Sequence, residues 1–227
     1  MRQLALELAA PPAPSLDNFI AGRNGELLAA LRALAAAAPG ERFIYFWGPR
    51  GCGKSHLITA AAGALHAAGR SIACIGSETR LLAADDDSPA GLAVDDVHLL
   101  SAAGQAELFK RYNRVRERAG VLLASGDAPP AGLKLRADLV TRLGWGLVYQ
   151  LYALSDGEKA AALAEHARSR GLPVPAEVID YVLARQRRDL PHLMALLDAL
   201  DRYSMENKRA ITVPLVRELL AADEPGR

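Results

Sequence analysis

The sequence has few cysteines, few aromatic residues and almost no excess of either charge. Its two cysteines, Cys52 and Cys74, cannot build a disulfide framework, so we expect folding without disulfides or a structural metal in a reducing cytoplasm. No run of about 18 apolar residues is available to span a bilayer. The formal net charge of +1 provides no global basic field, and nucleic acid is therefore not the default partner.

The N-terminal residues also lack the features of an export signal. The apolar stretch behind Arg2 is interrupted by Glu7 and then by several prolines, and no cleavage site of small residues follows. Residues 1–15 are predicted to be an extended, flexible tail. The remainder is half hydrophobic and long enough for one α/β domain and a smaller second domain.

Strands and helices alternate through the first two thirds of the chain. Apolar runs predict strands at residues 43–47, 71–75, 92–94, 121–124 and 148–151. Helical spacing predicts helices at residues 27–38, 54–68 and 103–118. Such alternation is typical of a parallel sheet covered by helices, so the expected fold class is α/β.

Only helices are predicted after residue 155. Their expected positions are residues 156–169, 176–187, 190–206 and 213–222. The predicted domains are therefore a tail (1–15), an α/β nucleotide-binding domain (16–154) and a helical domain (155–227).

A glycine-rich loop stands between the first strand and the following helix. It matches G-x-x-x-x-G-K-[ST] at every fixed position and comprises Gly48, Pro49, Arg50, Gly51, Cys52, Gly53, Lys54 and Ser55. Backbone N–H groups of such a loop wrap phosphates, Lys54 reaches the β- and γ-phosphates, and the Ser55 hydroxyl binds Mg²⁺. The expected cofactors are ADP or ATP and Mg²⁺; the alternative is a chance glycine turn.

Two carboxylates follow the third strand. Asp95 is the predicted second protein ligand of Mg²⁺, and Asp96 the residue that polarises the attacking water. A pair of acidic residues after a strand can also be a helix N-cap. Asp127, which follows the fourth strand, is a candidate sensor of the nucleotide, although Ser125, Gly126 and Asp127 together also suit a plain turn.

These motifs, in this order, resemble those of AAA+ proteins. The string from Thr141 to Leu147, TRLGWGL, resembles the S/T-R-x-G-W-G string of the DnaA group, and the similarity spans residues 20–222. The resemblance implies a P-loop AAA+ three-layer core with a small all-helical lid. Unlike DnaA itself, the sequence has a short acidic segment at residues 76–91 and no DNA-binding domain after the lid. The resemblance is therefore greatest to the DnaA-homologous regulatory inactivators.

In that group a short tail carries a peptide that binds the sliding clamp. The candidate here runs from residue 3 to 8, in which Leu4, Leu6 and Leu8 are apolar anchors and Gln3 supplies an amide. The alternative is a disordered chain start without a partner.

The resemblance also assigns a role to Arg142. An AAA+ arginine at this position is a finger that reaches into a neighbouring subunit's nucleotide site, here ATP bound to DnaA. The alternative is an ion pair with Asp138, four residues earlier on a helix. Pro191 stands where relatives carry a sensor arginine, and Arg188 is the candidate substitute, so hydrolysis by this chain itself is in doubt.

The histidines, Cys52 and the tryptophans are not predicted to take part in the chemistry. Five histidines, at positions 56, 66, 98, 166 and 192, show no zinc spacing and are predicted to lie at the surface or behind the residues of a site. Cys52 is expected to fill space in the loop rather than react. Trp47 and Trp145 are expected to be core or interface anchors.

Three functions remain in competition. The leading one is a clamp-tethered, nucleotide-bound adaptor that makes DnaA hydrolyse its ATP; homo-oligomers are allowed, and membrane or sequence-specific DNA binding is not expected. The second is an autonomous AAA+ ATPase that loads a helicase or remodels nucleic acid. The third, a truncated initiator that binds DNA, is disfavoured because no helix-turn-helix follows residue 222.

Overall fold

The computed structural model describes residues 12–76, 91–185 and 190–223. The chain divides into two compact units: residues 14–153 form one, and residues 154–227, together with 1–13, are assigned to the other. Each is described by itself below. Among the described residues, no helix is long and apolar enough to cross a membrane.

The first unit is built on a five-stranded parallel sheet. Its strands are β1 (Phe43–Trp47), β2 (Ile72–Ile75), β3 (Gly91–Val94), β4 (Val121–Gly126) and β5 (Leu147–Gln150). They lie in the order β2-β3-β4-β1-β5, and every neighbouring pair is parallel. β3 and β4 are buried along their whole length, as their apolar composition dictates, whereas β5 is an edge strand with two exposed apolar side chains, Leu147 and Val148.

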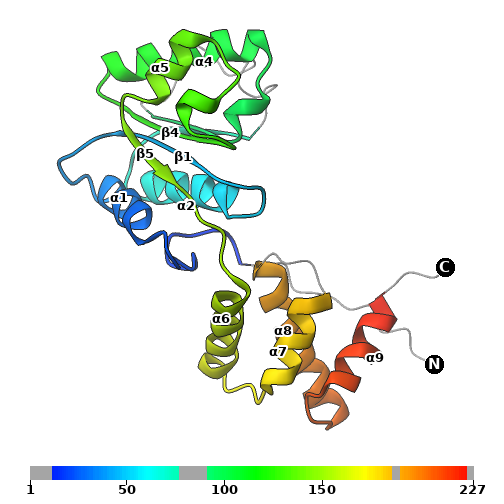
Figure 1. Ribbon diagram of the computed structural model, residues 1–227. Helices are drawn as coiled ribbons and strands as arrows, with labels where there is room; N and C mark the ends of the chain where they lie inside the picture. Colours follow the sequence, from blue (N-terminus) through cyan, green and yellow to red (C-terminus); the bar gives the residue numbers. More distant parts are fainter. Residues whose placement is uncertain (1–11, 77–90, 186–189, 224–227) are drawn as a thin grey trace. The chain divides into compact units, whose positions relative to one another are not determined.

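Helices cover both faces of this sheet (Figure 1). One face packs against α1 (Gly25–Ala35) and α2 (Lys54–Ala67), which supply leucines and alanines to a shared core. The other face packs against α4 (Ala102–Glu117) and α5 (Ala137–Leu143). The predicted three-layer α/β core is thus confirmed.

The fourth strand is longer than its apolar run predicts. β4 continues through Ser125 and Gly126, which pair with Phe46 and Trp47 of β1, and the N–H of Gly48 donates to the carbonyl of Gly126. Ladder hydrogen bonding therefore outweighs the turn preference of a Ser-Gly pair. This extension carries a polar side chain into the core beneath the glycine-rich loop.

The second unit consists of helices. They are α6 (Asp156–Ser169), α7 (Ala176–Arg185), α8 (Leu190–Asn207) and α9 (Val213–Asp223). A capping box, in which the Ser155 and Glu158 side chains satisfy each other's backbone N–H groups, begins α6. Apolar residues from all four helices form a core of their own. The predicted helical domain is confirmed as a lid-like bundle.

Several sequence predictions fall on residues outside the described ranges. They are the clamp-peptide residues Gln3, Leu4, Leu6 and Leu8, the sensor substitute Arg188, and most of the acidic segment at 76–91. Pro191 lies in the first turn of α8. Backbone N–H groups there have no carbonyl partner within the helix, so a proline, which lacks the N–H, is tolerated.

Candidate functional site

The predicted nucleotide-binding residues gather at the carboxyl ends of three adjacent strands. The glycine-rich loop follows β1, the Asp95–Asp96 pair follows β3, and Asp127 follows β4, which lies between them. In open parallel sheets, the carboxyl edge is where ligands bind. The sheet order therefore places the loop and the carboxylates around one position.

The loop backbone is shaped to receive an anion. Gly51 and Gly53 have φ angles of 80° and 104°, a region that side chains with a Cβ rarely adopt. Gly53 is the N-cap of α2, and within the described part of the chain no side chain caps this end and no acidic residue lies in its first turn. The first N–H groups of α2 are thus left for a bound group of negative charge.

Two glycines also permit close packing around the loop. A Cβ at Gly48 would lie 2.3 Å from the backbone oxygen of Leu151, and one at Gly53 would lie 2.9 Å from the Phe19 ring. The segment before α1 is fixed against the loop through His56, whose Nε2 is 3.1 Å from the carbonyl oxygen of Ser15. The loop is therefore held by its surroundings on two sides.

Lys54 points back over the loop that precedes it. Its Nζ donates to the carbonyls of Gly48, at 3.1 Å, and Pro49, at 3.4 Å, and lies 3.8 Å from Oδ1 of Asp96. The side chain is only 9% exposed. A buried ammonium held by two loop carbonyls is positioned to exchange them for phosphate oxygens, which are stronger acceptors.

The Asp95 carboxylate is oriented by Ser125 from the neighbouring strand. The Ser125 hydroxyl donates to Oδ1 of Asp95, and the N–H of Asp96 contacts both that oxygen, at 3.1 Å, and the Ser125 hydroxyl, at 3.0 Å. Both hydrogen bonds of the orienting network use the same carboxylate oxygen. The second oxygen of Asp95 is free of hydrogen bonds to the described residues, which suits a cation or its water ligands.

Asp96, His98 and Asp127 form a second polar group beside Lys54. The Nδ1 atom of His98 lies 3.9 Å from Asp96 Oδ1 and 3.8 Å from Asp127 Oδ1, too far for hydrogen bonds. Among the described residues, Asp96 Oδ1 and His98 Nδ1 are buried polar atoms without a hydrogen-bond partner. Such orphaned atoms fit a site that a water molecule or ligand completes.

Two residues of these networks were not among the predicted site residues. His98 was expected to lie at the surface or behind the site residues, and it lies between two predicted site carboxylates. Ser125 belongs to the stretch at the end of the fourth strand where a polar side chain was expected to sense the nucleotide; Asp127 was chosen for that role, and Ser125 is the fully buried residue that contacts Asp95. The available signal was a polar residue at the end of a buried strand that neighbours the loop strand.

The other loop residues are placed as follows. Cys52 is buried, and burial raises the pKa of its thiol although the Lys54 charge acts in the opposite direction. Such a thiol is a poor nucleophile, as expected for a space-filling role. Pro49, Arg50 and Ser55 are exposed at the loop and at the start of α2.

Arg142 lies on α5, and none of its side-chain contacts with other described residues involves the loop, Asp95 or Asp96. Its guanidinium carbon is 4.1 Å from the centroid of the Trp145 ring. The alternative ion pair with Asp138 is wrong, because Asp138 pairs with Arg136 at 2.7 Å. The hydrogen bond from Arg136 lowers the pKa of the Asp138 carboxyl below its usual value.

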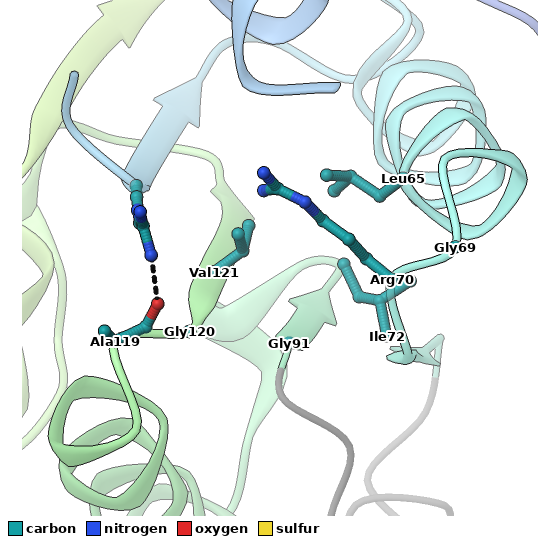
Figure 2. A pocket seen from close by; sticks show the side chains of 9 residues that line it. Leu65, Gly69, Arg70, Ile72, Gly91, Ala119, Gly120 and Val121 are labelled. Carbon is teal, nitrogen blue, oxygen red and sulfur yellow. Dashed lines mark hydrogen bonds between the residues drawn. The ribbon is translucent and has the colours of Figure 1, made fainter. Parts of the chain in front are cut away.

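A cavity of about 340 Å³ lies at the opposite edge of the sheet. It is lined by residues at the start of β2, β3 and β4 and at the ends of α2 and α4, including Arg70 (Figure 2). Arg42 donates to the carbonyl of Ala119 at its border. The carboxyl ends of α2 and α4 border this cavity, where the positive charge of an arginine is favourable. It is not connected with the candidate site at the carboxyl edge.

Comparison with known proteins identifies the fold and the lid. Residues 156–220 match the family model described as the lid domain of Hda. Domain III of the replication initiation protein DnaA from Thermotoga maritima is similar over 94% of this chain and 98% of that chain, with a TM-score of 0.74 and 20% identity.

Two further structures share the architecture. AMPPCP-bound DnaA from Aquifex aeolicus is similar over 87% of this chain and 68% of that chain, with a TM-score of 0.70 and 23% identity. A RuvB variant from Thermotoga maritima is similar over 96% and 76%, respectively, with a TM-score of 0.61 and 18% identity. The resemblance read from the sequence is thereby confirmed at the level of the fold: the chain has the fold of DnaA domain III, and its helical unit matches the model described as the lid domain of Hda over residues 156–220.

Proposed function

We propose that this chain is a nucleotide-bound adaptor that stimulates ATP hydrolysis by DnaA while tethered to the DNA-loaded sliding clamp. The observation that carries the proposal is the match of residues 156–220 to the lid domain of Hda, in a chain with the DnaA fold. Faster loss of ATP from DnaA prevents re-initiation of replication. The adaptor works in the cytoplasm.

The nucleotide of the adaptor is ADP or ATP with Mg²⁺. The glycine-rich loop and Lys54 hold the phosphates, while Ser55 and Asp95 hold the cation. Three observations support this assignment: the uncapped start of α2, the two loop glycines with positive φ, and the orphaned Asp96 oxygen. The similarity to a DnaA structure that contains AMPPCP agrees with it. When bound, the cation neutralises phosphate charge and fixes phosphate orientation.

Arg142 acts on the nucleotide of DnaA rather than on its own. Among the described residues, its side-chain contacts are with aromatic rings on α4 and with Trp145 in the turn after α5, and they do not include the loop or Asp95. A fixed guanidinium brought to the γ-phosphate of a partner stabilises charge in the transition state, and an arginine supplied in trans accelerates hydrolysis by about 10³ to 10⁵. Hydrolysis on DnaA then requires contact between the two proteins.

Residues 3–8 provide the tether. Leu4, Leu6 and Leu8 enter apolar pockets of the clamp while the Gln3 amide forms hydrogen bonds with it. Tethering raises the local concentration of the adaptor at replicating DNA, where initiation has just occurred.

A second candidate function is favoured by one observation. Lys54, Asp95 and Asp96 lie together, so the chain carries the principal groups for hydrolysing its own nucleotide. An autonomous ATPase, such as a helicase loader or remodelling motor, uses such a set. It predicts rapid multiple-turnover hydrolysis without DnaA, whereas the adaptor predicts slow hydrolysis alone.

The deciding experiment follows single-turnover decay of ATP on DnaA with loaded clamp and an excess of this chain. The parent chain is expected to accelerate the decay, and Arg142→Ala to lower that acceleration by at least about 100-fold. Arg142→Lys should restore little, because an ammonium does not reproduce the planar fork of guanidinium. Lys110→Ala, which removes an exposed positive charge from the neighbouring helix α4, is the control. Equal rates for Arg142→Ala and the parent would remove the mechanism.

A further inference from the structure

The guanidinium of Arg142 lies among three aromatic rings. Its carbon is 4.1 Å from the centroid of Trp145, 5.6 Å from that of Phe109 and 5.7 Å from that of Tyr112. Phe109 and Tyr112 lie on α4, and α5 packs against α4 on the same side of the sheet (Figure 1). Arg116 approaches the Trp145 ring as well, at 4.6 Å.

This arrangement restrains Arg142 without using its hydrogen-bonding capacity. Within the part of the chain that the structure describes, the Arg142 side chain takes part in no hydrogen bond or ion pair, and the nearby carboxylate of Asp138 is engaged by Arg136. A guanidinium has five N–H donors, and stacking on an aromatic face leaves their edges available. The side chain is thus held in place while its donors remain ready for an acceptor.

Trp145 is not needed to fill the core. Its side chain is 51% exposed, whereas the neighbouring Leu143 is buried. The backbone around it is nevertheless tightly fixed, since a Cβ at Gly146 would lie 2.1 Å from the carbonyl oxygen of Phe43. An indole mounted on a rigid turn and left half in solvent is suited to support another side chain.

We propose that Trp145 is the positioning residue of the arginine finger: its indole holds the Arg142 guanidinium extended and oriented before the partner's γ-phosphate arrives. The inference rests on the proposed function. A long arginine side chain samples many rotamers in solvent, and only a few of them direct its donors at a phosphate on another chain. Stacking on Trp145 limits this sampling before contact.

The test uses the full chain with Trp145→Leu and Trp145→Phe. In single-turnover decay of DnaA-bound ATP at saturating adaptor, Trp145→Leu is expected to lower the rate by about 10-fold, and Trp145→Phe, which keeps an aromatic face, by less. The half-saturating adaptor concentration should change little. Met205→Ala removes an exposed apolar side chain in the helical unit and is the control.

A double-mutant cycle separates positioning from general destabilisation. If Trp145 acts through Arg142, then Trp145→Leu should add almost nothing to the loss caused by Arg142→Ala. Additive losses, or a Trp145→Leu rate equal to that of the parent, would overturn the inference. Failure of the parent chain to stimulate DnaA would overturn the proposed function itself and the positioning role with it.

A measurement on the isolated adaptor tests the stacking directly. The Nε–H resonance of Arg142 in an NMR spectrum should be displaced by the indole ring current in the parent chain, retained in part in Trp145→Phe and lost in Trp145→Leu. An Arg142 resonance that is the same in the parent and Trp145→Leu would contradict the proposed contact, whatever DnaA does.

Discussion

Lys54 is the side chain on which phosphate binding most directly depends. In this structure its ammonium is nearly buried and donates to two loop carbonyls, which are weaker acceptors than phosphate oxygens. Replacing these carbonyls by phosphate oxygens contributes to the affinity for nucleotide. The entropy cost of ordering the lysine side chain is small, because the side chain is already held.

We therefore expect Lys54→Ala to weaken ADP binding by about 100-fold, the loss of a charge-assisted hydrogen bond at a buried site. Isothermal calorimetry measures the affinity. Lys110→Ala, an exposed lysine on α4, is the control and should bind ADP as the parent does. Undiminished binding by Lys54→Ala would remove the loop from the nucleotide site.

Cys52 offers a pH-dependent test of the loop's packing. Burial raises the pKa of its thiol above the ordinary value of 9.0, despite the opposing charge of Lys54. A raised pKa keeps the thiol protonated to higher pH, so the reactive thiolate forms later in the native protein than in the unfolded chain.

Alkylation of Cys52 by iodoacetamide should thus be slow at pH 8, with a pH midpoint above 9. Mass spectrometry on a Cys74→Ala background follows this cysteine alone, and the same reaction in denaturant gives the reference. Rapid modification of the native protein near pH 8 would show that the thiol is neither buried nor shifted.

Among single residues, the sequence predicted the site residues that belong to a motif and did not predict those that only the fold brings to the site. Lys54 and Asp96 were assigned from their spacing, and they lie 3.8 Å apart. Ser125 and His98 belong to no motif. Ser125 contacts Asp95, 30 positions away, and His98 lies near Asp127 after the next strand, because parallel strands end at one edge of the sheet. Only the order of strands in the sheet reveals that neighbourhood.

The elements themselves were largely predictable, and their ends less so. Continuous apolar runs predicted the five described strands. For β3 and β4 the reason is burial along their whole length, which leaves no polar face, whereas β5 is apolar although its side chains are largely exposed. Boundaries moved by up to three residues where hydrogen bonds decided them, as at Ser125 and Gly126. The sheet order was not predictable, because it depends on packing between residues far apart in sequence.

The turn between α5 and β5 shows how one glycine fixes an element. Gly144 and Gly146 flank Trp145, but their surroundings differ: a Cβ at Gly146 would lie 2.1 Å from the Phe43 carbonyl oxygen, whereas at Gly144 the nearest atoms are 3.6 Å away. The close approach at Gly146 lies where β5 enters its pairing with β1.

Gly146→Ala should accordingly destabilise the protein by at least about 2 kcal/mol, because backbone atoms must shift to admit the methyl group. Gly144→Ala, with room for its Cβ and an ordinary helical conformation, should remain within about 1 kcal/mol of the parent. Urea unfolding compares the two. Equal stability of both variants would contradict the close approach.

At the scale of the whole molecule, the proposed function divides its work between distant parts of one chain. In this proposal, residues 3–8 bind the clamp, the α/β unit holds nucleotide, and Arg142 engages DnaA. Because each task depends on different residues, a substitution that abolishes one task should leave the other two intact. A tether helps only if it is covalently joined to the finger, because its effect is to raise the local concentration of that finger.

This requirement gives a complementation test. A variant with Gln3, Leu4 and Leu6 replaced by alanine should retain Arg142 but fail to bind the clamp, whereas Arg142→Ala should bind the clamp but fail to stimulate DnaA. If the tether and the finger must belong to one chain, a mixture of the two variants should stimulate DnaA no more than the more active of them does alone. The assay is single-turnover decay of DnaA-bound ATP with loaded clamp. Recovery toward the parent rate would mean that chains associate, so that a tethered copy recruits a copy with an intact finger.

Because tethering acts through concentration, a large excess of the tail variant should itself recover part of the parent rate, and Arg142→Ala should not at any concentration. That difference in concentration dependence separates the loss of a tether from the loss of a catalytic group.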